Sequence, residues 1–244
     1  MPEIQNHKSE ITNQKSSYPW VVVGLLSIVA LLNYMDRQML STMQHAIKVD
    51  IVELQKAEAF GFLMSVFMWI YAVMSPIAGS IADRVNRKWL IVGSLFVWSA
   101  VTYGMGMATT YNQLLWLRGF MGVSEALYIP AGLAMIADYH TGKTRSLAVG
   151  IHMTGLYLGQ ALGGFGATVA EKYTWHTAFH WFGIIGIVYS IVLVFFLREK
   201  KSRKLNLNDK SLASTKLPLL KGLSMLFSMT AFWVILFYFA APSL

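Results

Sequence analysis

Hydrophobic residues along the chain gather in long continuous runs that short polar segments separate. Six runs are about 20 residues or longer, at 19–42, 59–82, 89–108, 112–137, 146–170 and 177–197. A helix needs about 20 mostly apolar residues to cross the roughly 30 Å hydrocarbon core of a bilayer. A seventh run begins at Met225 and extends to Leu244. The pattern predicts an all-α, polytopic membrane protein with six spans and the start of a seventh.

The amino-acid composition excludes several classes of protein. Hydrophobic residues make up 55% of the 244 residues and charged residues 13%, against about 25% charged in soluble domains. The absence of cysteine excludes disulfides, thiolate metal sites and cysteine nucleophiles. No soluble-enzyme motif such as G-x-S-x-G, H-E-x-x-H or a P-loop is present. We therefore expect no enzymatic activity, no cofactor and no bound metal.

The basic residues predict the orientation. With a cytoplasmic N-terminus, the inner segments hold fifteen Lys and Arg, whereas the outer loops hold three: Lys48, Lys56 and Lys172. Cytoplasmic loops of membrane proteins carry such an excess. The net charge of +8 is thus explained by topology and requires no nucleic-acid partner. We expect an integral protein of a bacterial inner membrane, with contact between its basic segments and anionic lipid as an alternative role for those segments.

Charge and polarity also divide the chain into four parts. These are a cytoplasmic tail (1–18), a six-helix bundle (19–198), a basic cytoplasmic linker (199–224) and the start of helix 7 (225–244). Some secondary transporters consist of two six-helix halves with the substrate site between them. The chain is therefore interpreted as the N-terminal half of such a transporter, and its expected partners are the lipid bilayer and the missing C-terminal half.

Ionisable residues inside the predicted spans are costly and point to function. Helix 1 carries Asn33, Asp36 and Arg37 at helical spacing, and helix 4 carries Arg118 and Glu125 two turns apart. Helical rise places Arg118 level with Asp36, and Glu125 deeper, away from both arginines. Tyr71 of helix 2 is expected at the depth of Glu125.

Two interpretations of this group remain open. In the structural one, Asp36 pairs with Arg118, and Arg37 lies at the membrane surface beside lipid headgroups. In the functional one, the carboxylates exchange protons while an arginine meets an anionic substrate group. Burial favours the neutral form of a carboxylate and a nearby arginine favours its charged form, so such a site can change protonation with its partners.

The segment between helices 2 and 3 contains Gly79, Asp83, Arg84, Arg87 and Lys88. It resembles the G-x-x-x-D-R-x-G-R-[RK] signature of the major facilitator superfamily, with Asn86 at the second glycine. Asparagine tolerates a left-handed turn better than most residues do. Gly79 is expected to allow close approach of two helices. Asp83, Arg87 and Lys88 are expected to hold the cytoplasmic side of this half against the C-terminal half.

The runs N-Y-M-D-R-Q of helix 1 and R-G-x-x-G-x-x-E-A of helix 4 narrow the resemblance. They look like the anion:cation symporter branch of sugar-acid and sialic-acid carriers, and like spinster-like transporters as second choice. The resemblance implies proton-coupled alternating access for a small organic anion. It implies substrate contacts at Asn33, Tyr34, Arg37 and Tyr71, and proton coupling at Asp36, Arg118 and Glu125.

Other functions stay as alternatives: a carrier of lipids or amphiphiles, a transporter-like membrane receptor, or an integral-membrane enzyme. Helix 5 holds a ladder of glycines that predicts close helix contact: Gly150, Gly155, Gly159, Gly163 and Gly164. His152 on this helix is expected to hydrogen-bond between helices, with substrate contact as the alternative. Trp20, Trp116 and Trp175 lie near span ends and are expected to be interface anchors.

Overall fold

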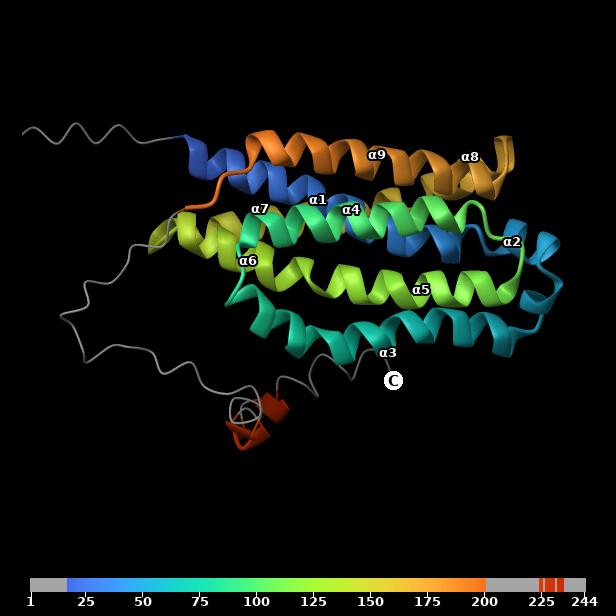
Figure 1. Cartoon of the computed structure of the whole chain (residues 1–244), viewed down its shortest axis with the longest axis horizontal. Coiled ribbons are helices and arrows are strands. Elements are labelled where there is room, and N and C mark those ends of the chain that lie inside the picture. Colours follow the sequence, from blue (N-terminus) through green and yellow to red (C-terminus); the bar gives the residue numbers. More distant parts are fainter. Residues whose placement is uncertain (1–16, 201–223, 226, 231, 235–244) are drawn as a thin grey trace, which may run out of the picture.

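The computed structural model describes residues 17–200, 224–225, 227–230 and 232–234. Most of the predicted tail, most of the predicted linker and most of the predicted seventh helix lie outside these described residues. Within them the fold is all-α, in one elongated helical bundle (Figure 1). In chain order the helices are α1 (Tyr18–Thr42), α2 (Gln44–Asp50), the short 3-10 helix η1 (Val52–Gln55), α3 (Ala57–Ala82), α4 (Arg87–Met105), α5 (Tyr111–Ala126), α6 (Tyr128–Tyr139), α7 (Lys143–Leu162), α8 (Phe165–Lys172) and α9 (Trp175–Phe196).

The bundle reproduces the six predicted spans. Four segments of the described chain are long and apolar enough to cross a membrane: Tyr18–Thr42, Ala57–Ala82, Tyr111–Tyr139 and Trp175–Phe196. The α4 helix and the α7–α8 pair lie alongside them with similar length (Figure 1). We call the end formed by α2, the α4–α5 connection and the start of α9 the α2 end, and the opposite end the α6 end.

Two predicted spans are interrupted. The fourth breaks at Leu127 between α5 and α6, three residues before Pro130, which has no N–H to bond the carbonyl of Ala126. The fifth breaks between α7 and α8 at the pair Gly163–Gly164. Proline and paired glycines are common causes of helix kinks. The first break comes directly after the turn that carries Glu125.

Among the described helices, α4, α5 and α9 begin with a side-chain cap. Thr110 and Gln113 form a capping box at the start of α5, which satisfies backbone N–H groups that have no intrahelical partner. Asn86 accepts a hydrogen bond from the backbone N–H of Trp89 at 3.1 Å and so caps α4. Its φ of −63° is not left-handed, so the backbone at this position does not require the glycine of the signature. The asparagine serves as an N-cap, which is a favoured position for this residue.

Glycines set the closest helix contacts. The most extensive helix pairs are α1 with α7, α4 with α9, and α3 with α5. A Cβ on Gly155 or Gly159 would overlap the backbone of α1 at Ser27 or Leu31, so the predicted close contact is confirmed there. A Cβ on Gly79, Gly150 or Gly164 would meet no described atom within 4 Å, so no contact of this part of the chain explains those three.

The tryptophans near span ends differ from one another. Trp20 and Trp116 are 40% and 72% exposed, as interface anchors are. Trp175 is 2% exposed, and its indole N–H donates to Asp50 Oδ2 at 2.6 Å. The prediction of an interface anchor was wrong for Trp175, because the connection between α1 and α3 folds over this end of the bundle and supplies a carboxylate.

Candidate functional site

A water-accessible cavity lies between α1, α3, α5 and α7. Its volume is about 490 Å³. Both intramembrane arginines line it together with polar, aromatic and sulfur-containing side chains: Tyr34, Arg37, Gln38, Met64, Ser65, Phe67, Met68, Trp69, Arg118 and Gln160. Intramembrane charges in transport proteins typically face such a cavity.

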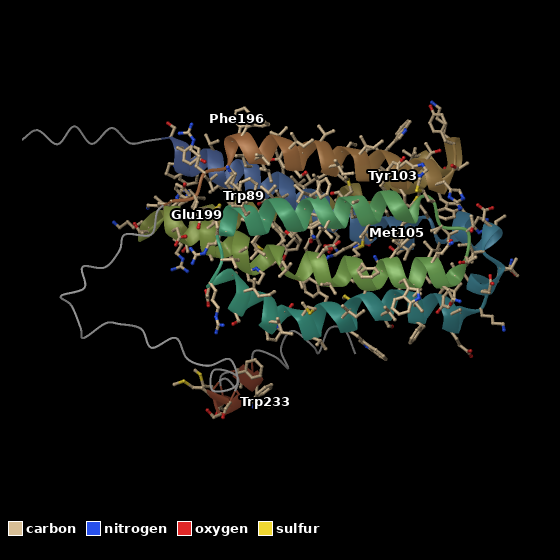
Figure 2. The ribbon with its side chains drawn as sticks, viewed as in Figure 1. Trp89, Tyr103, Met105, Phe196, Glu199 and Trp233 are labelled. Atoms are coloured by element: carbon tan, nitrogen blue, oxygen red, sulfur yellow. The ribbon has the colours of Figure 1, made fainter. Side chains whose placement is uncertain are left out.

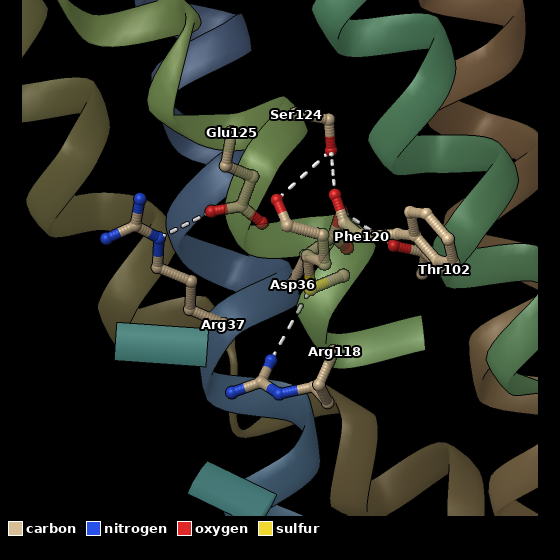
Figure 3. Close-up of polar contacts among 8 residues, drawn as sticks. Asp36, Arg37, Thr102, Arg118, Phe120, Ser124 and Glu125 are labelled. Atoms are coloured by element: carbon tan, nitrogen blue, oxygen red, sulfur yellow. Dashed lines mark hydrogen bonds and ion pairs between the residues drawn. The ribbon is translucent and has the colours of Figure 1, made fainter. Parts of the chain in front are cut away.

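Arg37 is held by a carboxylate and three aromatic rings. Its Nε lies 2.6 Å from Glu125 Oε2, and Figure 3 shows the two side chains facing each other from α1 and α5. The guanidinium carbon lies 4.5–5.0 Å from the ring centroids of Tyr34, Phe67 and Tyr71. Glu125 is fully buried, so the pair is shielded from bulk water on the carboxylate side. The charge of Arg37 is therefore compensated in this arrangement.

Arg118 has different neighbours. Its side chain is 1% exposed, and no carboxylate of the described residues lies within the 4.0 Å of an ion pair. Its guanidinium N–H groups face two sulfur atoms, at 3.4 Å on Met121 and 3.9 Å on Met64. Its guanidinium carbon lies 4.5 Å from the ring centroid of Phe67, and its Nε has no hydrogen-bond partner among the described residues. Arg118 is a buried cation whose charge these contacts do not neutralise.

Asp36 points away from the cavity toward α4. It is 4% exposed, and the Thr102 hydroxyl donates to its Oδ2 at 3.4 Å (Figure 3). No basic side chain of the described chain forms an ion pair with it. Asn33, fully buried one turn earlier on α1, lies beside the Glu125 carboxylate. The two carboxylates of the group are thus in distinct surroundings, one paired with an arginine and one not.

The contacts of the structural interpretation are absent among the described residues. Asp36 and Arg118 form no ion pair, and Arg37 is not at the membrane surface but bonded to Glu125. The expectation that Glu125 lies away from both arginines was wrong, because depth along separate helices does not fix which side chains meet across them. Tyr71 does not line the cavity, but it contacts Arg37 from the α3 side.

Several cavity residues were missed by the sequence reasoning. Gln38, Ser65 and Gln160 add polar groups, and Met64, Phe67, Met68 and Trp69 form apolar walls. Gln38 directly follows Arg37 in helix 1, so its polar side chain next to this group could have indicated that it lines the cavity. His152 is fully buried with its ring centroid 5.9 Å from that of Tyr128, and it is not among the residues that line the cavity.

The signature loop, between α3 and α4, lies at the α6 end of the bundle (Figure 1), where Figure 2 labels Trp89 and Glu199. Arg87 forms an ion pair with Asp138 of α6, and the Glu199 carboxylate accepts from the backbone N–H groups of Arg87 and Lys88 at 3.3 and 3.4 Å. Lys88 Nζ donates to the Val194 carbonyl at 2.7 Å. Asp83 and Arg84 are exposed and form no ion pair with a described residue.

The bundle and its apolar spans indicate an integral membrane protein, and two arginines line a cavity inside it. The chain belongs to the major facilitator superfamily, whose family model matches residues 26–244. It is 28% identical over 236 residues to the sphingosine-1-phosphate transporter SPNS2 of Xenopus tropicalis, covering 92% of this chain and 45% of that protein. It is 25% identical over 194 residues to a galacturonate transporter of Dickeya chrysanthemi, covering 76% of this chain and 53% of that protein.

A solved structure shares the fold. It is a bacterial homologue of the human lysosomal transporter Spinster in an inward-facing, unoccupied conformation, matched with a TM-score of 0.66 and 23% identity over 80% of this chain and 47% of that one. The chain spans about half the length of the relatives it matches. The predicted superfamily, the all-α fold and the resemblance to sugar-acid and spinster-like carriers are confirmed.

Proposed function

We propose that this chain forms the first half of a proton-coupled transporter that carries an organic anion by alternating access. The observation that carries the proposal is the charge balance of the cavity. Two guanidiniums line it, and only the one on Arg37 has a carboxylate partner among the described residues. A buried charge without a partner is strongly destabilising. An anionic substrate group would supply that partner to Arg118.

Arg118 is the proposed primary anion contact. Its planar guanidinium suits two-point hydrogen bonding to a carboxylate or phosphate. The sulfur atoms of Met64 and Met121 are weak acceptors, so they hold the side chain in place without competing with an oxyanion. Arg37, which the resemblance implied as a substrate contact, is already engaged by Glu125.

The Arg37–Glu125 pair is the proposed coupling element. A proton on Glu125 removes the negative partner of Arg37, and the freed guanidinium then attracts the substrate anion as a second contact. Loss of that proton restores the ion pair and releases the anion. Asp36 is a second proposed proton site, because a buried carboxylate without a cation partner is costly as an anion. The second six-helix half would supply the other wall of the cavity.

Two substrate classes fit different parts of the lining. The amides of Gln38 and Gln160 suit the hydroxyl groups of a sugar acid, in line with the galacturonate transporter among the relatives. The apolar wall of Met64, Phe67 and Trp69 suits the chain of an amphiphile with an anionic head, in line with the sphingosine-1-phosphate transporter. We favour the sugar acid, and keep the amphiphile as the second candidate.

Uptake by purified protein in vesicles tests the proposal. The chain joined to its second half is reconstituted and given an inward proton gradient, with galacturonate and sphingosine-1-phosphate as probes. We expect gradient-driven accumulation of galacturonate, and none by residues 1–244 alone, because one half encloses no complete cavity. Accumulation of the lipid only would favour the amphiphile carrier. Binding without any net movement would favour a receptor, and transport by the half chain would contradict the division into halves.

The membrane orientation is part of the same proposal. The excess of basic residues in the segments at the α6 end favours a cytoplasmic α6 end in a bacterial inner membrane. The natural chain has no cysteine, so single cysteines report accessibility directly. Asn112→Cys, in the first turn of α5, should react in intact cells with an impermeant thiol reagent, and Asn86→Cys should not. The reverse pattern would overturn the orientation.

A further inference from the structure

Three separate segments meet at the α2 end around Asp50. Asp50 is the last residue of α2, Trp175 and His176 begin α9, and Gly106 follows α4. The Trp175 indole N–H donates to Asp50 Oδ2 at 2.6 Å, and the Trp175 and His176 rings stack with centroids 3.7 Å apart. A Cβ on Gly106 would lie 2.8 Å from the His176 carbonyl oxygen, so the end of α4 and the start of α9 are in close contact.

The two ring nitrogens of His176 have different partners. Nδ1 lies 2.8 Å from the carbonyl oxygen of Gly106, and Nε2 lies 3.7 Å from Asp50 Oδ2. A carbonyl oxygen only accepts hydrogen bonds, so Nδ1 carries a proton in this arrangement. A neutral imidazole has one N–H, which leaves a lone pair on Nε2 facing the carboxylate. Only the imidazolium presents an N–H to Asp50 while it keeps its bond to Gly106.

We propose that Asp50 and His176 form a proton-responsive clasp, which tightens the attachment of α2 to α9 when His176 is charged and loosens it when His176 is neutral. Both side chains reach water, with 33% of His176 and 51% of Asp50 exposed. Histidine is the side chain that ordinarily changes charge between about pH 5 and pH 8. The Trp175 hydrogen bond to Asp50 does not depend on this proton, so α2 keeps one link to α9 in both states, and the proton on His176 adds or removes a second link.

Other titratable groups on the surrounding elements do not replace Asp50 in this role. Lys48 of α2 donates to Gln44 at 3.5 Å, Tyr103 of α4 packs against the His180 ring at 4.6 Å, and Lys172 lies over Tyr173 at 5.5 Å. The positive end of the α9 dipole opposes a charge on His176, and Asp50 is the described carboxylate that offsets it. The remaining groups on these elements make no ion pair with His176: His45 on α2, Glu171 on α8 and His180 on α9.

The clasp is positioned to affect the candidate cavity. A single residue, Met43, separates α2 from α1, and Arg37 lies less than two turns before the end of α1. Fastening α2 therefore restrains the end of the helix that carries the Arg37 side of the ion pair with Glu125. Acid on the α2 side would restrain this end, and neutral pH would release it.

Spin labelling of the full 244-residue chain in lipid nanodiscs tests the clasp. Val49 lies on α2, is 65% exposed and, as Val49→Cys, would be the only cysteine present. The nitroxide spectrum at about pH 5.5 and about pH 7.5 brackets the ordinary histidine range. We expect the ratio of immobile to mobile label to rise about two- to fivefold on acidification, the range for a half-exposed ion pair.

Three variants in the Val49→Cys background make the test specific. His176→Gln and Asp50→Asn should each abolish the pH response, and the amide oxygen introduced by Asp50→Asn would still accept from Trp175. His45→Gln, at an exposed histidine on the same α2 helix, should leave the response intact. A response that persists in His176→Gln, or its absence in the parent chain, would overturn the proposal. If a variant fails to fold by circular dichroism, the parent titration alone still decides, because the clasp requires a pH response there.

Discussion

Arginine and carboxylate side chains meet in two regions of this molecule. In one region the arginine is paired with a carboxylate, and in the other only one of two arginines is. At the α6 end, Arg87 and Asp138 pair at the surface, with 25% and 41% of their side chains exposed, and Glu199 accepts from two backbone N–H groups nearby. In the cavity, Glu125 is fully buried and Arg118 is 1% exposed. The cavity cluster leaves Arg118 without a carboxylate of the described residues at ion-pair distance, although its burial makes that costly.

The difference separates a structural role from a functional one. Forming or breaking an exposed ion pair changes the free energy of unfolding little, because water solvates either charge when the pair opens. A buried cation cannot be solvated in that way, so the fold tolerates it only where something else supplies the compensating charge. Residue type alone does not distinguish the two regions. Burial combined with incomplete pairing does, and it supports the proposal that a ligand binds in the cavity.

The largest effect is expected at Arg118. Arg118→Gln keeps a polar side chain of similar length but removes the charge that the substrate anion is proposed to meet. Loss of one partner of a buried charge pair costs about 2–5 kcal/mol, or roughly 30- to several-thousand-fold in affinity. Anion affinity of the protein with both halves, measured by isothermal titration, checks this. The matched control is Arg87→Gln at the α6 end, which should bind the anion normally. Equal losses in both variants would erase the distinction between the regions.

Proton coupling is the next test of the cavity. Glu125→Gln imitates the protonated carboxylate and cannot re-form the ion pair with Arg37, so we expect anion exchange to continue while gradient-driven accumulation falls at least about thirtyfold, the low end for loss of a buried charged partner. Asp36→Asn should give a separate defect of the same kind. Counterflow and proton-driven uptake in the same vesicles distinguish exchange from accumulation. Undiminished accumulation in both single variants would contradict the proposed coupling.

The sequence was sufficient for the fold, but it identified only part of the cavity lining. Of the residues it singled out, Tyr34, Arg37 and Arg118 line the cavity, whereas Asn33, Asp36, Tyr71 and Glu125 do not. Hydrophobic runs of about 20 residues predicted the six spans, because bilayer thickness sets helix length. Spacing along α1 and α5 identified Arg37, Arg118 and Glu125 as a group. The spacing could not show that Arg37 pairs with Glu125 while Asp36 has no arginine partner among the described residues. That outcome depends on how α1 and α5 are rotated about their own axes. The role of Asn86 as a cap was missed for a similar reason: the local backbone decided it.

A third prediction asks whether the packing of α1 positions the cavity. A Cβ on Gly159 would overlap the backbone of Leu31, two turns before Gln38 on α1. Gly159→Ala should therefore destabilise the chain by about 1–3 kcal/mol and weaken anion binding through displacement of α1. Gly150→Ala, on the same helix with no described atom within 4 Å of the added Cβ, should be neutral or stabilising by up to about 1 kcal/mol. Unfolding in mixed detergent micelles measures both, and equal effects would mean that close packing at Gly159 is unimportant.

The smallest effect is expected at the surface pair of the α6 end. Asp138→Asn removes the ion pair with Arg87 but leaves the backbone carbonyl of residue 138, which accepts from Lys200 at 2.6 Å. Because both side chains are partly in water, we expect a loss of only about 0.2–1 kcal/mol in the free energy of unfolding. Salt near 1 M, where the screening length is about 3 Å, should reduce the difference between variant and parent. A loss above about 3 kcal/mol that salt does not change would show that Arg87 becomes a buried, unpaired charge in the variant. An unpaired arginine would then be as costly at the α6 end as in the cavity, and the contrast between the two regions would not hold.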